Sequence, residues 1–370
     1  ERYTPAVDVW SCGCVLGELF TKKPLFQADR ESLQLEAISR VCGSPNPMIW
    51  PEVNDLRFFH TIKPKKNYRR RLREEYVMIP PLALSMLKTA PKVIKNTING
   101  GYARGYQDAI KHVKEPILCL LNNDVEVTEN WLNPIINIFD KEAQTAVIQP
   151  KILDKKNPKY FEYAGAAGGY VDRLGYPYCR GRIFDFIEID QNQYDNTPVF
   201  WASGACFFIR NKVFHEVGGF DTDYFAHMEE IDLCWRIFNA SYDTKYCKEA
   251  TVYHLGGSTL NNLNPDKTYL NFRNSLFTIL KNSPNPTIII LLRLILDGIA
   301  AIYLFTKYIS NKGHLHFFDV IRAHVHFYVH IPKMIKKRKK ILLKRKDYYN
   351  KNSILWLYHI KNMKTFKSVS

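Results

Sequence analysis

The sequence lacks the paired cysteines that form zinc knuckles or redox motifs. Its eight cysteines are scattered, and no two of them are separated by two residues. The closest pair, Cys12 and Cys14, has one residue between its members, which is a poor spacing for a zinc site. We therefore expect free thiols in a reducing compartment.

Acidic residues are few compared with basic ones, at 36 Asp and Glu against 52 Lys and Arg, and the net charge is +16. Such a charge fits nucleic acid, an anionic membrane surface or phosphorylated substrates. The densest basic run, at 333–346, follows an apolar stretch, and this order favours a membrane over nucleic acid. With 370 residues, 46% of them hydrophobic, the chain is long enough for about two domains with packed cores. Global disorder is excluded.

The first ninety residues read as a helical fragment. Apolar residues at 8–20 recur at helical spacing, 31–41 also suits a helix, and SPNP at 44–47 breaks it. The segments ERYTPAVDVWSCGCVLGELFTKKPLFQA, ISRVCGSPNP and KPKKNYRRRLREE closely resemble the C-lobe of transcriptional cyclin-dependent kinases, over about residues 1–88.

That resemblance implies an all-α kinase C-lobe fragment in which Asp8 would brace a catalytic loop. The chain contains no HRD or DFG motif and no Gly-rich loop with a paired lysine. Because these parts perform phosphoryl transfer, we expect residues 1–88 to be inactive as a kinase. We expect no cyclin binding either, since the N-lobe helix that contacts cyclin is missing.

A different pattern begins after 87–91. A Gly-rich stretch, NTINGGYARGYQDAI, suits a tight turn into a helix, and a plain loop explains it as well as a phosphate cradle does. The apolar run 117–121 predicts a buried parallel strand, and a helical stripe follows at 131–139. Asp124 lies between them, where it could hold Mg or Mn or simply form an Asn/Asp turn.

A third block predicts a helix with an acidic start. Glu229 and Glu230 open it, and they fit either a catalytic base or an ordinary response to the helix dipole. Asp232 and Arg236 are spaced to pair along this helix. A short strand then ends at His254, which fits a structural histidine or a ligand.

In order, five motifs resemble family 2 glycosyltransferases of the GT-A fold, in the rhamnosyltransferase-like branch, over about residues 92–370. They are NGGYARGY, LLNNDVEVTENWL, WASGACFFIR, HMEEIDLCWR and VYHLGGST. The resemblance implies an α/β fold, with a Rossmann-like, mostly parallel sheet at 92–283 that lacks the family's first strands. Membrane-associated helices and a polybasic tail would follow at 284–370.

The resemblance also assigns roles to individual residues. It implies an inverting, metal-dependent transfer from a nucleotide-diphosphate sugar to a cell-surface polysaccharide or lipid-linked acceptor, with Mg or Mn as cofactor. The charges of Arg180 and Arg182 add a possible contact with donor phosphates. The expected site is as follows: Glu230 as base and Glu229 beside it; Asp124 and His254 at the metal; Asn99, Gly101, Arg104, Asn123, Arg180 and Arg182 at the donor; Trp201 and Gly204 at the acceptor; Asp232 and Arg236 in support.

Two alternatives to a transferase stay open at this point. The chain could be a non-catalytic chimera, either a gene-model or assembly artefact or a truncated pseudo-enzyme, because the kinase-like piece stands where the transferase's first strands should be. It could also be a remnant of a cyclin-dependent protein kinase. A nucleotide-sugar donor and a glycan or lipid-linked acceptor are the partners that the first reading requires, and nucleic acid is not among them.

The apolar stretch 285–305 is about as long as a membrane span, but Arg293 and Asp297 interrupt it. A spanning helix, an interfacial helix and a buried amphipathic helix all fit this pattern. The lysine-rich run after it would lie on anionic lipid headgroups. We therefore expect the chain at the cytoplasmic face of a membrane, bound peripherally or by a single span.

Overall fold

The computed structural model describes residues 25–28, 30–48, 53, 54, 64, 66–75, 96, 98–256, 264–309 and 313–369. The chain divides into two compact units, Glu1–Lys95 and Asn96–Ser370. The expected helix at 8–20, with Asp8, Cys12 and Cys14, and the change of pattern at 87–91 lie outside the described residues.

In the first unit, two helices are described, α2 (Glu31–Cys42) and α4 (Leu72–Glu75). Gly43, at φ 88°, ends α2. The loop after it is tied to the approach to α4, because the Ser44 N–H donates to the Tyr68 carbonyl and the Tyr68 N–H donates to Ser44 Oγ. The Tyr68 hydroxyl also donates to Glu36.

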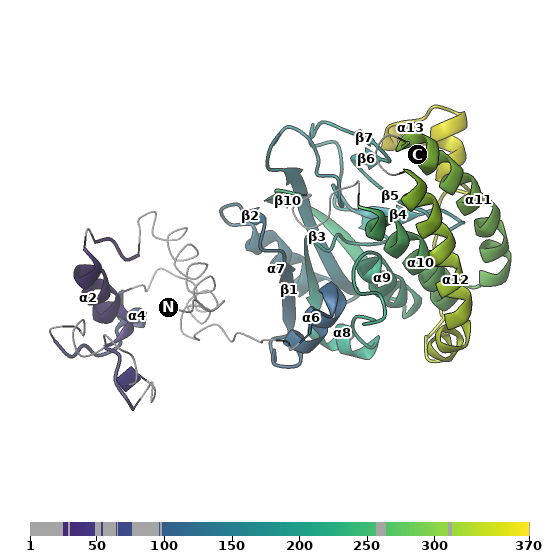
Figure 1. The fold of residues 1–370 in the computed structure, drawn as a ribbon. Helices are drawn as coiled ribbons and strands as arrows, with labels where there is room; N and C mark the ends of the chain where they lie inside the picture. The colour runs from purple at the N-terminus through teal and green to yellow at the C-terminus, as the bar shows by residue number, and fades with distance from the viewer. Residues whose placement is uncertain are drawn as a thin grey trace. The chain divides into compact units, whose positions relative to one another are not determined.

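The second unit is built on a six-stranded sheet in the order β1-β9-β3-β10-β2, with β8 pairing to β10 (Figure 1). Its long central strands are buried and rich in β-branched and aromatic residues, as strands covered on both faces require. The strands of this sheet are β1 (Ile117–Leu121), β2 (Val125–Val127), β3 (Thr145–Asp154), β8 (Pro198–Val199), β9 (Cys206–Arg210) and β10 (Asp243–His254).

The prediction of a mostly parallel sheet is wrong for the described residues. Only β3 and β10 pair in parallel, and the other pairings in this sheet are antiparallel. The reason is that β9 runs in the opposite direction between β1 and β3, which share one direction. Strand β1 is also half exposed at the end of the strand order, with Leu121 39% exposed, so it is not the buried parallel strand that its apolar run predicted.

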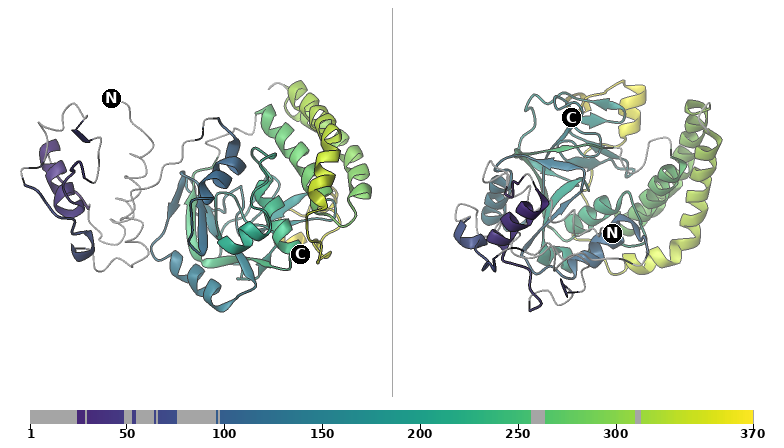
Figure 2. Two further views of the ribbon diagram at one scale, coloured as in Figure 1. Left: turned by 90° about the horizontal axis from the view of Figure 1, so that it is seen from below. Right: turned by 60° about the vertical axis from the view of Figure 1, so that its left-hand side comes forward.

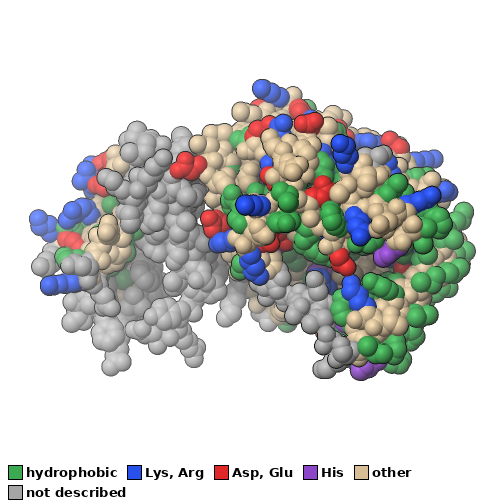
Figure 3. All heavy atoms as spheres, turned by 90° about the horizontal axis from the view of Figure 1, so that it is seen from above, with side chains coloured by type: hydrophobic (Ala, Val, Ile, Leu, Met, Phe, Trp, Pro, Cys, Tyr) green, Lys and Arg blue, Asp and Glu red, His purple; other side chains and the backbone are tan. Residues whose placement is uncertain are grey.

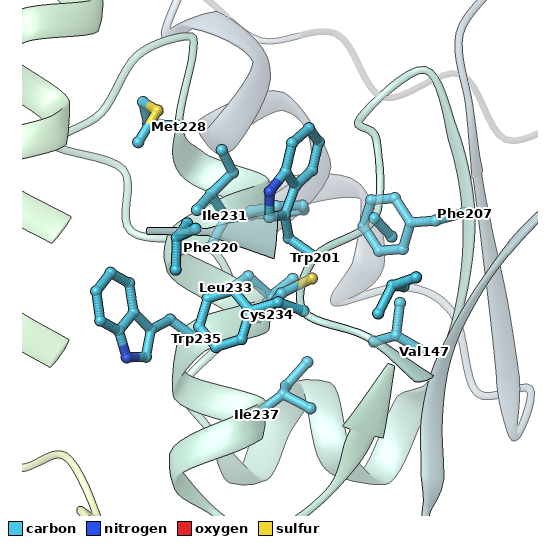
Figure 4. Packing of buried hydrophobic residues seen from close by; sticks show 14 of the residues in the cluster. Val147, Trp201, Phe207, Phe220, Met228, Ile231, Leu233, Cys234, Trp235 and Ile237 are labelled. Atoms are coloured by element: carbon cyan, nitrogen blue, oxygen red, sulfur yellow. The ribbon is translucent and has the colours of Figure 1, made fainter. Parts of the chain in front are cut away.

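Helices cover both faces of this sheet. Helix α7 (Leu132–Lys141) buries Ile135 and Phe139 against one face. The other face is covered by α6 (Gly101–Ile110), α8 (Asn211–Glu216) and α9 (Glu229–Asn239). Figure 4 shows side chains of α9, among them Ile231 and Leu233, packed near Val147 of β3 and Phe207 of β9.

A second, four-stranded sheet follows β3, in the order β4-β5-β6-β7. The C-terminal segment packs on it through Ile354 and Val369, and contains η2 (Trp356–Ile360) and α13 (Phe366–Val369). The strands of this sheet are β4 (Gly169–Val171), β5 (Pro177–Cys179), β6 (Arg182–Ile183) and β7 (Phe186–Ile187).

Three long helices complete the second unit: α10 (Pro265–Asn282), α11 (Pro286–Lys307) and α12 (Gly313–Arg338). Helix α12 packs along both others, and α10 also contacts α9. Figures 1 and 2 show the three helices side by side at one end of the second unit. Asn264 caps α10 by accepting from the Asp266 N–H, and Pro265 occupies its first turn.

Candidate active site

The ends of β1 and β10 bring Asp124 and His254 together at one edge of the main sheet. Because β1, β3 and β10 share a direction, the turns that follow them open on the same side. His254 is the last residue of β10, and its Nε2 lies 3.1 Å from Asp124 Oδ1. The Leu255 N–H donates to the Asp124 carbonyl and fixes the two turns together.

Glu162, which the sequence analysis did not single out, lies on the other side of the imidazole. Its Oε1 is 3.3 Å from His254 Nδ1, and the two side chains are only 6% and 8% exposed. Its Oε2 accepts the Ala164 N–H at 2.5 Å. Burial alone would lower the pKa of His254, but the Glu162 and Asp124 carboxylates raise it above its usual range. The histidine is therefore held between two carboxylates.

This arrangement fits a divalent metal ion that is shared with a substrate. Among the residues described, no three His, Cys, Asp or Glu side chains are arranged to enclose a metal. A Mg-type ion, however, commonly uses one or two protein ligands and takes the rest of its shell from water and substrate phosphates. A carboxylate behind the distal nitrogen is also the usual support of a metal-binding histidine. Asp124 and His254 are suitable ligands for such an ion.

Glu229 and Glu230 start helix α9 as two carboxyl groups in a confined space. One oxygen of each is buried and has no hydrogen-bond partner within the described part of the chain. Burial raises the pKa of Glu230 to about 7, and burial together with Glu230 raises the pKa of Glu229 well above its usual range. A carboxyl group that titrates near neutral pH is suited to general base catalysis.

The loop before α9 is held in an unfavourable backbone conformation. Phe225, His227 and Met228 have φ values of 65°, 69° and 70°, a region that L-residues rarely occupy. Asn274 of α10 fastens this loop, since its Nδ2 donates to the carbonyls of Tyr224, Ala226 and His227 at 3.0, 2.9 and 2.7 Å.

Arg273 adds to this clamp. Its guanidinium donates to the carbonyls of Asp223 and Tyr224, and its Nε donates to Asn274 Oδ1 at 2.9 Å. Both side chains are buried. Helix α10 therefore fixes the backbone that aims Glu229 and Glu230, and neither clamp residue was singled out from the sequence.

Electrostatic neighbours join the base region to the metal region. Cys179 lies within electrostatic range of both Glu162 and Glu230, and burial is the main reason why the pKa of its thiol is raised. Burial, reinforced by the nearby Lys267, lowers the pKa of His227 to about 4. Lys267 also lies near Glu162. Glu162 and the region at the start of α9 thus share the neighbours Cys179 and Lys267.

Behind this site, Asp232 and Arg236 form the expected ion pair. Arg236 Nη2 lies 2.8 Å from Asp232 Oδ2, and both side chains are buried. Lys281 of α10 contacts Asp232 at 2.8 Å and Asp221 at 2.6 Å. Burial opposes ionisation of Asp232, but Lys281 and Arg236 lower its pKa below the usual range. This ion-pair network joins α9 to α10.

The expected donor loop forms the start of α6. Asn99 Oδ1 accepts the Gly101 N–H at 3.0 Å, which closes a turn before the helix. Gly101 has φ +74°, and a Cβ there would lie 2.1 Å from the Phe225 carbonyl oxygen. Arg104 is exposed and pairs with Asp108 of the same helix. The loop before α9 thus packs directly on Gly101 through Phe225.

Asn123, the remaining expected donor residue of this region, is exposed beside Asp124. Arg180 and Arg182 differ from each other in their surroundings. Arg180 is buried and donates to the carbonyls of Ala167 and Asp195, so its guanidinium has structural partners. Arg182 is half-buried and lies in electrostatic range of Glu162, which places it nearer the metal region.

The two expected acceptor-side residues occupy the segment before β9. Trp201 is buried, and its Nε1 donates to the Tyr170 carbonyl while its ring lies against Gly169. The Gly204 carbonyl accepts the Tyr102 hydroxyl at 2.8 Å. Glu229 and Glu230 both lie in electrostatic range of that hydroxyl. Gly204 is therefore linked to the base region through Tyr102, whereas Trp201 serves the packing between the two sheets.

Comparisons with known proteins match both parts of the chain. Residues 83–218 match the family model described as Glycosyl transferase family 2. This match ends before Glu229, Glu230 and His254. Among solved structures, the chain is similar to GalNAc-T7 with UDP, GalNAc and Mn2+, at a TM-score of 0.41 and 14% identity, over 59% of this chain and 40% of that one.

The chain is also similar to cyclin-dependent kinase 12. It is 61% identical over 87 residues to that protein from Drosophila melanogaster, and 58% identical over 81 residues to that from Caenorhabditis elegans. These stretches are 24% and 22% of this chain but 8% and 11% of the relatives, so the chain spans about a tenth of their length. Both resemblances predicted from the motifs are confirmed: the chain combines a segment that matches glycosyl transferase family 2 with a stretch similar to cyclin-dependent kinases.

Proposed function

We propose that the second unit transfers a sugar from a nucleotide-diphosphate donor to an acceptor hydroxyl, with inversion at the anomeric carbon. The observation that carries the proposal is that the half-buried Glu230, next to the buried Glu229, shares an electrostatic neighbour, Cys179, with Glu162, which contacts His254 beside Asp124. The carboxyl pair is suited to accept a proton, and the histidine with its aspartate to hold a metal against phosphate.

In this proposal, each residue acts at a stated place. Deprotonated Glu230 accepts the proton of the acceptor hydroxyl as its oxygen attacks the anomeric carbon. Asp124 and His254 would hold the divalent ion, which, when bound, stabilises the negative charge of the departing nucleoside diphosphate. Glu162 orients the imidazole of His254 through Nδ1.

The neutral group beside the base has its own role. Glu229 has the higher pKa of the pair, because burial and the neighbouring Glu230 both disfavour its charge. Glu229 therefore favours the protonated form more than Glu230 does, and Glu230 is the member of the pair that gives up its proton first. The clamp formed by Arg273 and Asn274 keeps both groups in place during the reaction.

The remaining assignments concern the two substrates. We propose that Asn99, Gly101, Arg104, Asn123 and Arg182 lie along the donor, and that Gly204 lies on the side of the acceptor. A cell-surface polysaccharide or a lipid-linked glycan is the proposed acceptor. The first unit is not proposed to transfer phosphate, since the chain contains no HRD or DFG motif.

Release of nucleoside diphosphate from a panel of UDP-, GDP- and dTDP-sugars tests this function. With Mn2+ present, we expect release from at least one donor, and chelation of the metal should abolish it. The Asp124→Asn variant should lose the activity, whereas Asp140→Asn, at an exposed position of helix α7, should retain it. Absence of both release and metal-dependent donor binding across the panel would favour the non-catalytic chimera.

A further inference from the structure

Helix α11 buries charged residues and exposes apolar ones, the reverse of a helix that packs on a water-soluble core. Its buried stripe consists of Ile289, Arg293, Asp297 and Ala301, which include two charged residues. The other faces of α11 carry large apolar side chains in contact with solvent. Their exposed fractions reach 64% at Ile288, 61% at Leu291, 64% at Ile295, 59% at Ile299 and 60% at Ile302. Such a surface requires an apolar partner.

The buried charges fasten α11 to the rest of the second unit. Arg293 Nε donates to Asp297 Oδ1 at 2.9 Å, and the Tyr176 hydroxyl donates to the same oxygen at 2.9 Å. His324 of α12 lies 3.1 Å from Asp297 Oδ2, and Arg293 Nη1 donates to Ser275 of α10 at 2.9 Å. A spanning α11 would have to leave these partners and carry an ion pair into hydrocarbon. Among the described residues, it is the one helix long and apolar enough to span, yet its contacts hold it on the domain.

Helix α12 extends the same kind of surface. Phe318 is 62% exposed, Val325 is 58% exposed and Val329 is 69% exposed. These residues line a shallow groove together with Ile321 and the side chains of Arg322, His326 and His330. Figure 3 shows hydrophobic side chains gathered on the side of the second unit where α11 lies in Figure 1.

The basic run at 333–346 begins in the last turns of α12 and contains residues paired within the domain as well as exposed lysines. Lys337 pairs with Asp221 and Asp223, and Lys333 also pairs with Asp223, at 2.7 Å. Arg338 donates to the carbonyls at the end of α10. These three residues therefore have partners within the domain, and the contact of the run with lipid stays a prediction. The exposed members of the run are Lys333, Lys336, Lys339, Lys340, Lys344 and Lys346.

We propose that the exposed apolar faces of α11 and α12 lie in the headgroup region of an anionic bilayer, without crossing it. Exposed lysines at the end of α12 supply the charge that anionic headgroups attract. A second copy of the chain would bring a like charge to the same place, in a protein whose net charge is +16. This proposal is independent of the transferase chemistry, so either can fail alone.

Flotation of the full chain with vesicles tests the proposal. We expect binding to phosphatidylcholine vesicles that contain phosphatidylglycerol, and weaker binding to phosphatidylcholine alone or at high salt. The double variant Ile295→Glu, Ile299→Glu should bind the anionic vesicles about a hundredfold more weakly, because two apolar side chains that would enter the bilayer are lost. The matched control Ile189→Glu, at a position 46% exposed outside these helices, should bind like the unchanged chain.

A second measurement does not depend on the charged variants folding. Ile295→Trp should show fluorescence quenching by brominated lipid beyond that of the unchanged chain, and Ile189→Trp should not. Failure to float with anionic vesicles, or full binding by the double variant, would overturn the proposal. Protease added outside the vesicle that cleaves only one flank of α11, while the other flank is protected inside, would indicate a span and would also overturn the proposal. A dimer in lipid-free solution that the double variant dissociates, without vesicle binding, would identify a second copy as the occupant instead.

Discussion

The substitution Asn274→Ala tests whether α10 holds the loop that precedes the proposed base. It removes the Nδ2 donor shared by three carbonyls and the Oδ1 that accepts from Arg273. Two neutral donor hydrogens contribute about 1 kcal/mol each and the bond from the guanidinium about 1.5–3 kcal/mol. The free energy of unfolding should therefore fall by about 3.5–5 kcal/mol.

The loop should also relax locally. Its three residues with positive φ cost about 1–3 kcal/mol each, and such conformations persist only where neighbours enforce them. Without Asn274, the amides of residues 225–230 should exchange hydrogen faster than in the unchanged chain. Denaturant unfolding of the protein measures the first effect, and hydrogen exchange with mass spectrometry measures the second.

Asn239→Ala is the matched control, because Asn239 is also buried but donates a single side-chain bond, to the Asn282 carbonyl at 3.1 Å. It should cost about 1 kcal/mol and leave exchange at residues 225–230 unchanged. Equal losses of stability in both variants, with no local change in exchange, would refute the clamp.

Three further predictions follow from the geometry. Lys281→Met removes one of the two cations that pair with each of the buried carboxylates Asp232 and Asp221, which keep Arg236 and Lys337 respectively, and it should cost about 3 kcal/mol of stability. Since Lys281 lowers the pKa of both carboxyls, this stability is present at neutral pH and is lost in acid. The free energies of unfolding of the two proteins should therefore converge as the pH falls, and a constant difference would contradict the assignment. Glu162→Gln should weaken Mn2+ binding about 10–100-fold, measured by calorimetry with a nucleoside diphosphate present, because Glu162 supports the imidazole of His254. Glu126→Gln, which changes an exposed residue paired with Lys155, should leave Mn2+ binding unchanged. Equal affinities in the two variants would show that Glu162 does not support a metal ligand. Gly101→Ala should lower the free energy of unfolding, measured with denaturant, by at least about 1 kcal/mol, because Gly101 has a positive φ and lies against the Phe225 carbonyl. Gly105→Ala, in open space on the same helix, should raise the free energy of unfolding. A Gly101→Ala variant as stable as the unchanged chain would refute the contact.

Local patterns in the sequence were sufficient for the elements that carry the site. Periodicity and spacing predicted the helix with Glu230, the pair of Asp232 and Arg236, and the strand that ends at His254. The direction of β9 was not predictable in this way, because strand pairing is a long-range choice and an apolar run does not encode it.

The residues that the sequence did not reveal act across the fold. Glu162 reaches His254 only because the loop after β3 returns to the end of β10, and no motif surrounds it. Asn274 reads as an ordinary position in a helix, yet it bonds to a loop of the site. The sequence indicated that Lys333 and Lys337 are free for lipid headgroups, but the structure pairs them with Asp223 and Asp221 respectively. Composition gives charges but not their partners.

The pH dependence of nucleotide release, compared between the unchanged chain and Glu230→Gln, tests the proposed transfer most directly. Burial raises the pKa of Glu230 to about 7, so release should rise with pH through that value as the base loses its proton. Stability should fall as the pH rises from the ordinary glutamate pKa of 4.5 to about 7, since over this range the folded state holds a proton that the unfolded state has released. Glu230→Gln should lower release by about 10²–10⁴-fold at every pH without weakening Mn2+ and donor binding. Release that persists in Glu230→Gln, or that does not depend on pH between 5 and 9, would contradict the account.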